Sequence, residues 1–468
     1  MVFSSLPFLC VFLPVVFGLC CLMPSVRAKN GLLIIASLLF YAYGEPVYVF
    51  LMIASTLANY VFGLLLRGGT VGFRKGMVAL AVIVNLGLLG VFKYADFFVS
   101  IVNGIAGTSF AGPGLALPIG ISFYTFQALS YVIDVYRRDI DAQQNYAKLL
   151  LYISFFPQLI AGPIVKYHDI AHMIDDRKMT VEGVKSGLRR FIVGLGKKVL
   201  IANILAVGVD AWYAQDPGSL NILSAWIVAF AYLFQIYYDF SGYSDMAIGM
   251  GRMFGFQIKE NFNHPYWSCS IKEFWRRWHI SLSTWFKEYL YIPLGGNRKG
   301  KARAALNRII VFFLCGLWHG AAWTFVIWGM FHGIFLLLEE YIPAIRRMPR
   351  AAGHIYAIVV VTVGFVIFRA DTIGQAGTII ALMFTGFNFD AVHMQVLCEQ
   401  LTPIFVLVFC LAAIGLLPVK DWTLAIAERW NLRALVHNAS YVAAFIILIV
   451  CLLELSTGGY NPFIYFRF

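Results

Sequence analysis

Charged residues are scarce in this sequence: Asp, Glu, Lys and Arg together make up 13% of its 468 residues, and hydrophobic residues make up 60%. Average soluble domains carry about 25% charged residues. The shortage of charge excludes an ordinary soluble protein and predicts a polytopic membrane protein. The chain is long enough to build a sizeable core within the membrane, and we expect one helical domain rather than several soluble ones.

Several signatures of enzyme chemistry are also missing. The eight cysteines include no CxxC pair and most lie inside apolar runs, which argues against a disulfide framework or a zinc site. No GxSxG or SxxK motif supports a serine nucleophile. No Walker A loop or GxGxxG sequence supports ATP hydrolysis or dinucleotide chemistry. His279, His319 and His332 lack the close spacing and nearby carboxylates of a metal site, so we expect no metal.

The positive charge that is present lies in short loops. The net charge is +12, and the loop positions favour topology signals and anionic lipid headgroups over nucleic acid. No Lys or Arg precedes the first apolar run, and the first positive charges, Arg27 and Lys29, follow it. This pattern predicts a retained first helix whose N-terminus lies outside and whose C-terminal end lies in the cytoplasm.

The apolar runs predict an all-α bundle of roughly 11–14 transmembrane, re-entrant and interfacial helices. After the first 23 residues they cover about 31–43, 46–66, 76–94, 117–135, 147–165, 183–215, 221–238, 243–256, 309–338, 354–368, 373–388, 402–417 and 438–456. Runs shorter than about seventeen residues cannot cross a bilayer alone. Such short runs favour a ring of helices around a thinned centre, where irregular backbone lines a cavity.

The run from Ile309 to Leu338 is the centre of the chain's organisation. As one helix it would be about 45 Å long, too long for a hydrocarbon core of roughly 30 Å. Its small-residue cluster at 316–322 offers a place to break or to pack closely. With the basic stretch 298–303 at the cytoplasmic edge, His319 and His332 fall near mid-depth, where an ionisable side chain is costly. A hydrogen bond between helices explains one such histidine; the cluster favours a functional role.

A second polar stretch, QIYYDFSGYSDM at 235–246, holds two carboxylates. Asp239 and Asp245 would point to nearly opposite faces of an unbroken helix, and Gly242 makes a break plausible. The carboxylates could orient a histidine or line a polar tunnel. Alternatively, Ser241 or Ser244 could cap a helix start.

The stretch 271–285 combines tryptophans, basic residues and a histidine, as is typical of the headgroup level. If 271–286 is helical, Trp275, Trp278, His279 and Trp285 do not share one narrow face, so the element should be buried on several sides. Arg276 and Arg277 could be interfacial anchors or could hold a phosphate-bearing donor.

Histidine near mid-depth suits acyl transfer. An imidazole can take a proton from an alcohol near neutral pH and return it to a leaving group. Transfer from a thioester to a hydroxyl needs that base and a donor for the developing oxyanion. His319 and a second histidine would suffice without a covalent enzyme intermediate.

Four long strings resemble the membrane-bound O-acyltransferase (MBOAT) family, and within it the bacterial alginate O-acetylase branch. They are PQLIAGPIVKY at 157–167, YYDFSGYSDMAIGMG at 237–251, EFWRRWHISLSTWFKEYLYIPLGGNRKG at 273–300 and GLWHGAAWTFVIWGMFHG at 316–333. The resemblance runs end to end, with a motif-rich core at about 118–342. It implies a single domain over 1–468, built as a helical bundle with a central funnel or tunnel.

The resemblance also implies residue roles. His319, in the Trp-His-Gly triplet, would be the catalytic histidine, and His279, in RWHISLS, would be the second histidine near the reaction centre. His332 would play a supporting part. As further tunnel-lining or supporting residues we group Trp318, Asp239, Tyr243, Asp245, Trp275, Arg276, Trp278 and Ser281.

The function implied is O-acetylation of an exported polysaccharide, directly or by relay onto a partner protein, with His319 as general base. We expect no tightly bound cofactor, and an acyl donor such as acetyl-CoA or an acylated carrier protein on the cytoplasmic side. Expected partners are an extracytoplasmic acetyltransferase, the polysaccharide and membrane lipids, in a bacterial cytoplasmic membrane. The alternatives are D-alanyl transfer to teichoic acid, or a transporter or flippase without enzyme activity.

Overall fold

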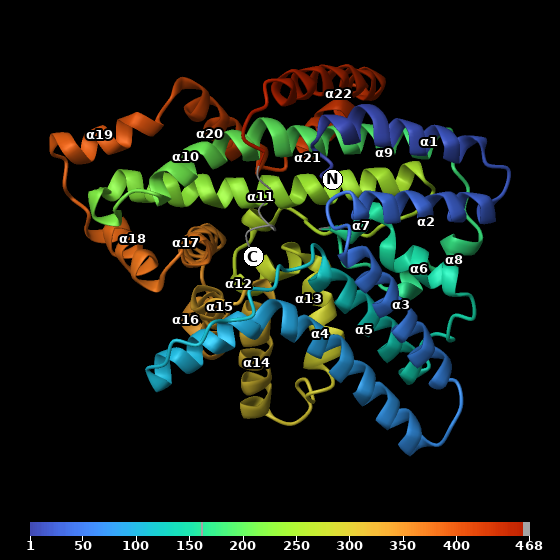
Figure 1. The fold of residues 1–468 in the computed structure, drawn as a ribbon. Helices are drawn as coiled ribbons and strands as arrows, with labels where there is room; N and C mark the ends of the chain where they lie inside the picture. The colour runs from blue at the N-terminus through green and yellow to red at the C-terminus, as the bar shows by residue number, and fades with distance from the viewer. Residues whose placement is uncertain (161, 462–468) are drawn as a thin grey trace. The chain divides into compact units, whose positions relative to one another are not determined.

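The structure is a computed structural model that describes residues 1–160 and 162–461. Over these residues the regular elements are helices, and no strand occurs in that part of the chain (Figure 1). The predicted all-α class is confirmed. The chain clusters into two compact units: unit 1 comprises Met1–Phe191 and Met246–Lys259, and unit 2 comprises Ile192–Asp245 and Glu260–Phe468. The expectation of a single domain over 1–468 stays a prediction.

Unit 1 contains the N-terminal helices. They are η1 (Phe8–Phe12), α1 (Leu13–Leu22), α2 (Val26–Ala42), α3 (Tyr48–Leu65), α4 (Val71–Ala106), α5 (Ile121–Arg137), α6 (Tyr146–Ser154), α7 (Phe156–Leu159), α8 (Tyr167–Asp175) and most of α9 (Val181–Gly196). The rings of Phe8, Phe40 and Phe156 meet in its core, with Phe40 centred 5.7 Å from each of the other two. Asn59 on α3 and Asn85 on α4 exchange side-chain hydrogen bonds of 3.0 and 2.8 Å. Such polar pairs join helices where lipid supplies no hydrophobic force between them.

Unit 2 carries every candidate site residue. Its elements are η2 (Lys197–Ala202), α10 (Asn203–Tyr213), η3 (Pro217–Ser219), α11 (Ile222–Met253, whose last turns belong to unit 1), η4 (Pro265–Trp267), α12 (Ile271–Arg277), α13 (Ile280–Phe286), η5 (Lys287–Tyr291), α14 (Lys301–His319), α15 (Trp323–Tyr341), α16 (Pro343–Arg346), α17 (Arg350–Arg369), α18 (Ile373–Thr385), α19 (Ala391–Gln400), α20 (Pro403–Gly415), α21 (Val419–Arg429) and α22 (Arg433–Ser456).

Several helices are long and apolar enough to cross a membrane. Within the described residues, six helices have the length and the apolar composition that a membrane span requires: Tyr48–Leu65, Val71–Ala106, Val181–Tyr213, Ile222–Met253, Arg350–Arg369 and Arg433–Ser456. Helices α19 and α20 add a seventh if they form one span bent by 71°. Shorter apolar helices, Phe8–Leu22 and Ile373–Thr385, accompany them. The predicted polytopic architecture with additional short segments is confirmed, whereas the central funnel or tunnel stays a prediction.

The predicted break in the run 309–338 is confirmed. Helix α14 ends at His319, α15 begins at Trp323, and the two helices pack against each other. A side chain at Gly316 would collide with the backbone carbonyl of Phe325, so the close approach requires glycine there. The chain turns back immediately after His319, which places this histidine at a helix end.

The suggested break at Gly242 is wrong. Helix α11 runs unbroken from Ile222 to Met253 and so joins the runs 221–238 and 243–256, which we expected to be separate segments. Gly242 serves close packing instead, because a Cβ there would lie 2.7 Å from the carbonyl oxygen of Gly194. Glycine inside a helix costs only about 1 kcal/mol, which the packing of this largely buried helix outweighs. Ser241 and Ser244 lie within the helix and cap no helix start.

Candidate active site

His279 lies at an abrupt turn between two short helices. Helix α12 ends at Arg277 and α13 begins at Ile280, so 271–286 is not one helix. His279 has φ 44° and ψ 54°, in the left-handed region. A residue other than glycine held there costs about 1–3 kcal/mol, and such strain gathers at functional sites. The predicted burial on several sides is confirmed, since the side chains of this stretch that we singled out are at most 8% exposed: Trp275, Trp278, His279 and Trp285.

Asn261 contacts this turn from a loop 18 residues earlier in the chain. Its Oδ1 accepts hydrogen bonds from the Ser281 backbone N–H (3.1 Å) and from Ser281 Oγ (2.9 Å). The same oxygen lies 3.3 Å from Nδ1 of His279. The backbone carbonyl of Asn261 accepts the N–H of Ile280 at 3.0 Å. Asn261 thus satisfies two amides at the start of α13 and contacts the imidazole as well.

His319 is the last residue of α14, and aromatic rings surround it. Its imidazole is centred 4.9 Å from the ring of Trp318, 5.0 Å from that of Trp328 and 5.3 Å from that of Phe368. His319 is 7% exposed. The predicted catalytic histidine is therefore enclosed by protein and lies at a helix end rather than within a continuous helix.

His332, on α15, is fully buried. Its ring lies 5.2 Å from Trp328 and 5.3 Å from Trp275, centre to centre. Neither ring nitrogen has a hydrogen-bond partner among the described residues. A Cβ on Gly364 would lie 2.8 Å from Nε2, so the α17 backbone closes that side of the ring.

Aromatic rings join the three histidines into one cluster. The ring of Trp318 lies between His279, 6.1 Å away, and His319, 4.9 Å away. Trp328 contacts both His319 and His332. The cluster, which we call the histidine cluster, thus draws on three places in the chain: the α12–α13 turn, the end of α14 and the middle of α15. The structure brings together His279, His319, His332, Trp275 and Trp318, all singled out from the sequence.

The other predicted supporting residues are placed differently. Trp278 is buried and stacks on Phe274 at 5.5 Å, and Tyr243 is buried on α11. Ser281 donates to Asn261 and lies 3.5 Å from Nδ1 of His279. Arg276 is exposed and lines a cavity.

The two α11 carboxylates pair with neighbouring lysines. Asp239 lies 2.6 Å from Lys198, with both side chains at most 3% exposed, and Asp245 lies 2.7 Å from Lys197. Six helix positions separate the carboxylates by about 120° around α11, and the two lysines are consecutive residues at the start of η2. The geometry gives each carboxylate a cation of its own. No described interaction joins either carboxylate to a histidine, so the suggestion that they orient one has no support from the described contacts.

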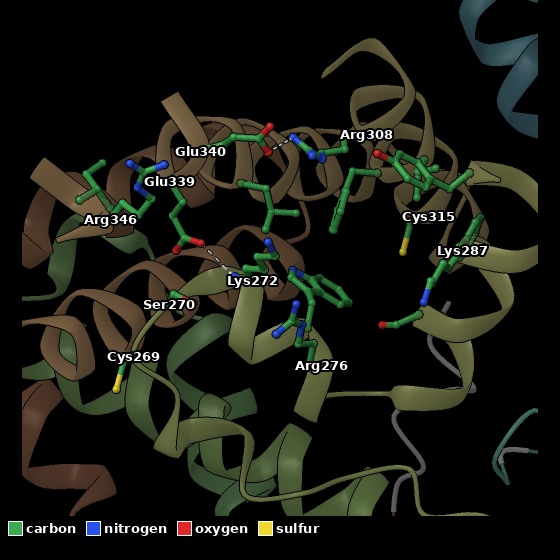
Figure 2. A pocket seen from close by; sticks show the side chains of 18 of the residues that line it. Cys269, Ser270, Lys272, Arg276, Lys287, Arg308, Cys315, Glu339, Glu340 and Arg346 are labelled. Carbon is green, nitrogen blue, oxygen red and sulfur yellow. Dashed lines mark hydrogen bonds and ion pairs between the residues drawn. The ribbon is translucent and has the colours of Figure 1, made fainter. Parts of the chain in front are cut away.

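A cavity of about 760 Å³ lies within unit 2 and carries a surplus of positive charge (Figure 2). Its basic lining residues are Lys272, Arg276, Lys287, Arg308 and Arg346, against two acids, Glu339 and Glu340. Glu340 pairs with Arg308. Figure 2 shows the Arg308–Glu340 pair at the top of the view, Lys272 and Arg276 near its centre, and Lys287 to the right of them.

The cavity and the histidine cluster share a wall. Trp275 lines the cavity and also packs against His332 and, at 5.7 Å, against Trp328. Glu339 accepts the backbone N–H groups of Ile271 and Lys272, which ties the end of α15 to the start of α12.

Sequence reasoning missed Asn261, Trp328, Phe368 and the lysines of the cavity. Trp328 stands four residues before His332, a spacing that places both on one helix face, so this signal was available. Nothing in the spacing of Asn261 or Phe368 indicates contact with a histidine, because tertiary packing alone brings them there.

Comparison with known proteins assigns the family. The model of the membrane-bound O-acyltransferase family matches residues 138–370, which include every candidate site residue. A probable alginate O-acetylase, AlgI, of Azotobacter vinelandii is 40% identical over the whole length of both chains. This chain belongs to the membrane-bound O-acyltransferase family. It is therefore an acyltransferase and a multi-pass membrane protein.

Two further relatives of this MBOAT protein carry other names. A peptidoglycan O-acetyltransferase of Helicobacter pylori is 37% identical over 80% of this chain and 78% of its own length. A teichoic acid D-alanyltransferase of Bacillus subtilis is 27% identical over 53% of this chain and 67% of its own. The similarity is thus longer and stronger to the two relatives named for O-acetyl transfer.

Proposed function

We propose that this enzyme moves an acetyl group from a cytoplasmic donor across the membrane for O-acetylation of an exported polysaccharide, directly or through a partner protein. One observation carries the proposal: His319 is buried at a helix end, in an aromatic cluster with two further histidines, beside a basic cavity. An ionisable group buried in a membrane protein is costly and is a functional candidate by default.

The reaction assigned to His319 is general base catalysis. The imidazole takes the proton of an acceptor hydroxyl as that oxygen attacks the thioester carbonyl. The C–S bond of the donor then breaks, and the imidazolium returns the proton to the thiolate. The new C–O ester bond leaves the acetyl group on the acceptor. His279 is the second histidine of this step, and His332 supports the cluster from behind Trp328.

The donor proposed is a phosphate-bearing thioester, either acetyl-CoA or an acylated carrier protein. Five basic side chains face two acidic ones in the cavity, and guanidinium groups bind phosphate with two parallel hydrogen bonds. Because Trp275 belongs to both the cavity wall and the histidine cluster, a thioester held in the cavity lies next to the proposed reaction centre. The donor is a substrate, and the mechanism calls for no tightly bound cofactor.

The named relatives support a glycan as the acceptor. The Azotobacter protein named for alginate aligns over its full length, and the Helicobacter protein named for peptidoglycan also concerns a glycan. D-alanyl transfer to teichoic acid has the weaker support, at 27% identity over 53% of the chain. A transporter or flippase without enzyme activity does not agree with membership of an acyltransferase family.

The proposed setting is a bacterial cytoplasmic membrane, with the N-terminus outside and the basic loop at 298–303 in the cytoplasm. An extracytoplasmic acetyltransferase and the polysaccharide are the proposed partners. Labelling of a cysteine introduced at Lys299 tests the orientation. Reaction only after the inner face becomes accessible is expected, and reaction in intact cells would overturn it.

The decisive experiment compares exported polymers from cells that lack the protein with those from cells complemented by wild type, His319→Ala or His437→Ala. His437 is an exposed histidine on α22 and serves as the matched control. Acetate released from the polymers by mild base is measured, together with the amount of each variant in the membrane. We expect wild type and His437→Ala to restore acetyl groups to one polymer, and His319→Ala to fail at equal abundance. Full restoration by His319→Ala would refute the proposed base.

A further inference from the structure

We propose that Asn261 is a positioning residue that holds His279 as the tautomer protonated on Nδ1, so that Nε2 presents its lone pair to the reaction. The inference rests on the proposed acyl transfer and specifies the part that the second histidine plays in it. It follows from the contacts of one amide side chain.

The orientation of the Asn261 amide is fixed by a group that can only donate. The backbone N–H of Ser281 points at Oδ1, 3.1 Å away, and a flipped amide would place an NH2 group against that N–H. The hydroxyl of Ser281 donates to the same oxygen at 2.9 Å, and Nδ2 faces Ser244 Oγ at 3.4 Å. The atom that faces His279 is therefore the oxygen, a hydrogen-bond acceptor.

An acceptor beside Nδ1 determines where the imidazole proton lies. Asn261 Oδ1 is 3.3 Å from Nδ1 of His279, so Nδ1 carries the hydrogen and, in the neutral ring, Nε2 carries the lone pair. Nε2 has no hydrogen-bond partner among the described residues, and His279 is 1% exposed. The ring packs on Phe240 at 4.6 Å and faces Trp318 at 6.1 Å. The described neighbours of the ring, Asn261, Ser281 and these two aromatic side chains, carry no formal charge.

The same asparagine holds the backbone of His279 in its left-handed conformation. Its carbonyl accepts the Ile280 N–H at 3.0 Å, and its side chain accepts the Ser281 N–H. His279, as the residue before α13, makes no side-chain cap of its own. Asn261 supplies that cap from outside and thereby keeps the imidazole free to point elsewhere.

This tautomer restricts the chemistry of His279. Neutral His279 can accept a hydrogen bond or a proton at Nε2 from a group of the bound substrate. It cannot, while neutral, donate from Nε2 to the oxyanion that develops on the thioester carbonyl. The structure thus assigns His279 the role of proton acceptor rather than neutral oxyanion donor.

The test uses Asn261→Ala and Asn261→Asp in the full-length protein reconstituted in vesicles. Acetyl transfer from acetyl-CoA is followed across a range of pH. Asn221 provides the matched control, because it is also buried and also caps a helix: its Oδ1 accepts the Ser224 N–H at 2.9 Å, remote from any histidine contact described. Asn221→Ala and Asn221→Asp should lower Tm without moving the pH profile.

We expect Asn261→Ala to lower kcat about tenfold or more with KM within about twofold, because the tautomer and ring orientation are lost. Asn261→Asp retains an acceptor and should be the more active of the two. Its carboxylate favours the imidazolium, so the acid limb of its pH profile should move to higher pH. A merely structural role predicts that the buried charge of Asn261→Asp is at least as harmful as alanine, with an unmoved acid limb. That result would overturn the proposal.

A spectroscopic reading separates this inference from the proposed function. In ¹⁵N spectra of histidine-labelled protein, the signals absent from His279→Gln belong to His279. We expect a protonated Nδ1 and a bare Nε2 in wild type, and a mixture of tautomers in Asn261→Ala. An Nε2-protonated ring in wild type would refute the inference even in an active enzyme. Absence of acetyl transfer by wild type would refute the proposed function and leave this spectroscopic result standing.

Discussion

Two polar regions of unit 2 differ in the partners of their ionisable side chains: those on α11 form ion pairs, whereas those in the histidine cluster lie among aromatic rings. On α11, Asp239 and Asp245 each face a lysine at 2.6–2.7 Å. In the histidine cluster, imidazoles lie against aromatic faces, and three ring nitrogens have no hydrogen-bond partner in the described part of the chain: Nε2 of His279 and both nitrogens of His332. A buried charge with its own counter-charge serves the fold, whereas an imidazole nitrogen that has no hydrogen-bond partner among the described residues, such as Nε2 of His279, can serve a substrate.

The comparison is tested most severely by breaking the most buried pair. Lys198→Met removes the cation that pairs with Asp239. Because Asp239 is only 2% exposed, a carboxylate left without this cation should lower the free energy of unfolding by about 3–5 kcal/mol. Thermal unfolding in detergent measures this loss. The double variant Lys198→Met/Asp239→Leu should regain most of it. If Lys198→Met kept wild-type Tm but lost acetyl transfer, the pair would belong to the reaction rather than to the fold.

In the histidine cluster the balance should reverse, with a large loss of activity and a small loss of stability. His279→Gln should reduce acetyl transfer about 100-fold, the scale of one general acid–base group, while Tm changes by a few degrees. Rates per folded molecule, corrected by unfolding curves, separate the two effects. Wild-type activity at a much reduced Tm would assign His279 to the fold, like the α11 carboxylates.

Substitutions in the cavity lining should weaken donor binding and leave the chemical step unchanged. Arg276→Glu reverses a charge on its wall and should raise KM for acetyl-CoA about tenfold with little change in kcat, as for a lost binding contact. Arg347→Glu makes the same change at an exposed residue outside the lining and is the control. Equal effects of the two variants would place donor recognition outside the cavity.

The smallest effect is expected at the more exposed α11 pair. The side chains of Lys197 and Asp245 are 25% and 16% exposed, so Asp245→Asn should cost about 1 kcal/mol or less and leave acetyl transfer intact. Thermal unfolding at low and high salt measures it. A loss as large as that of Lys198→Met would show that exposure does not distinguish the two pairs.

The sequence predicted those features that composition and short-range patterns determine. The apolar run 309–338 is too long for one straight span of the bilayer, and together with the small residues at 316–322 this length indicated a break. The motifs that resemble the MBOAT family predicted that His279 and His319 lie near one reaction centre. By contrast, Gly242 suggested a break in α11 that packing against Gly194 overrides.

What could not be predicted depends on contacts between distant segments. The turn at Trp278–His279 contains no glycine or proline, and the loop carrying Asn261 stabilises it from outside. The partners of Asp239 and Asp245 lie 41 and 48 positions away, beyond any helical periodicity. The basic cavity gathers side chains from α12, η5, α14 and α16, whose arrangement no single motif encodes.

The central claim is that the imidazole of His319 is the base for acyl transfer, and His319→Gln tests it most directly. Purified wild type and variant, matched for Tm, are reconstituted with acetyl-CoA and an acceptor polysaccharide, and ester formation is timed. The account predicts a rate at least about 100-fold lower for the variant. Ester formation at the wild-type rate would contradict it.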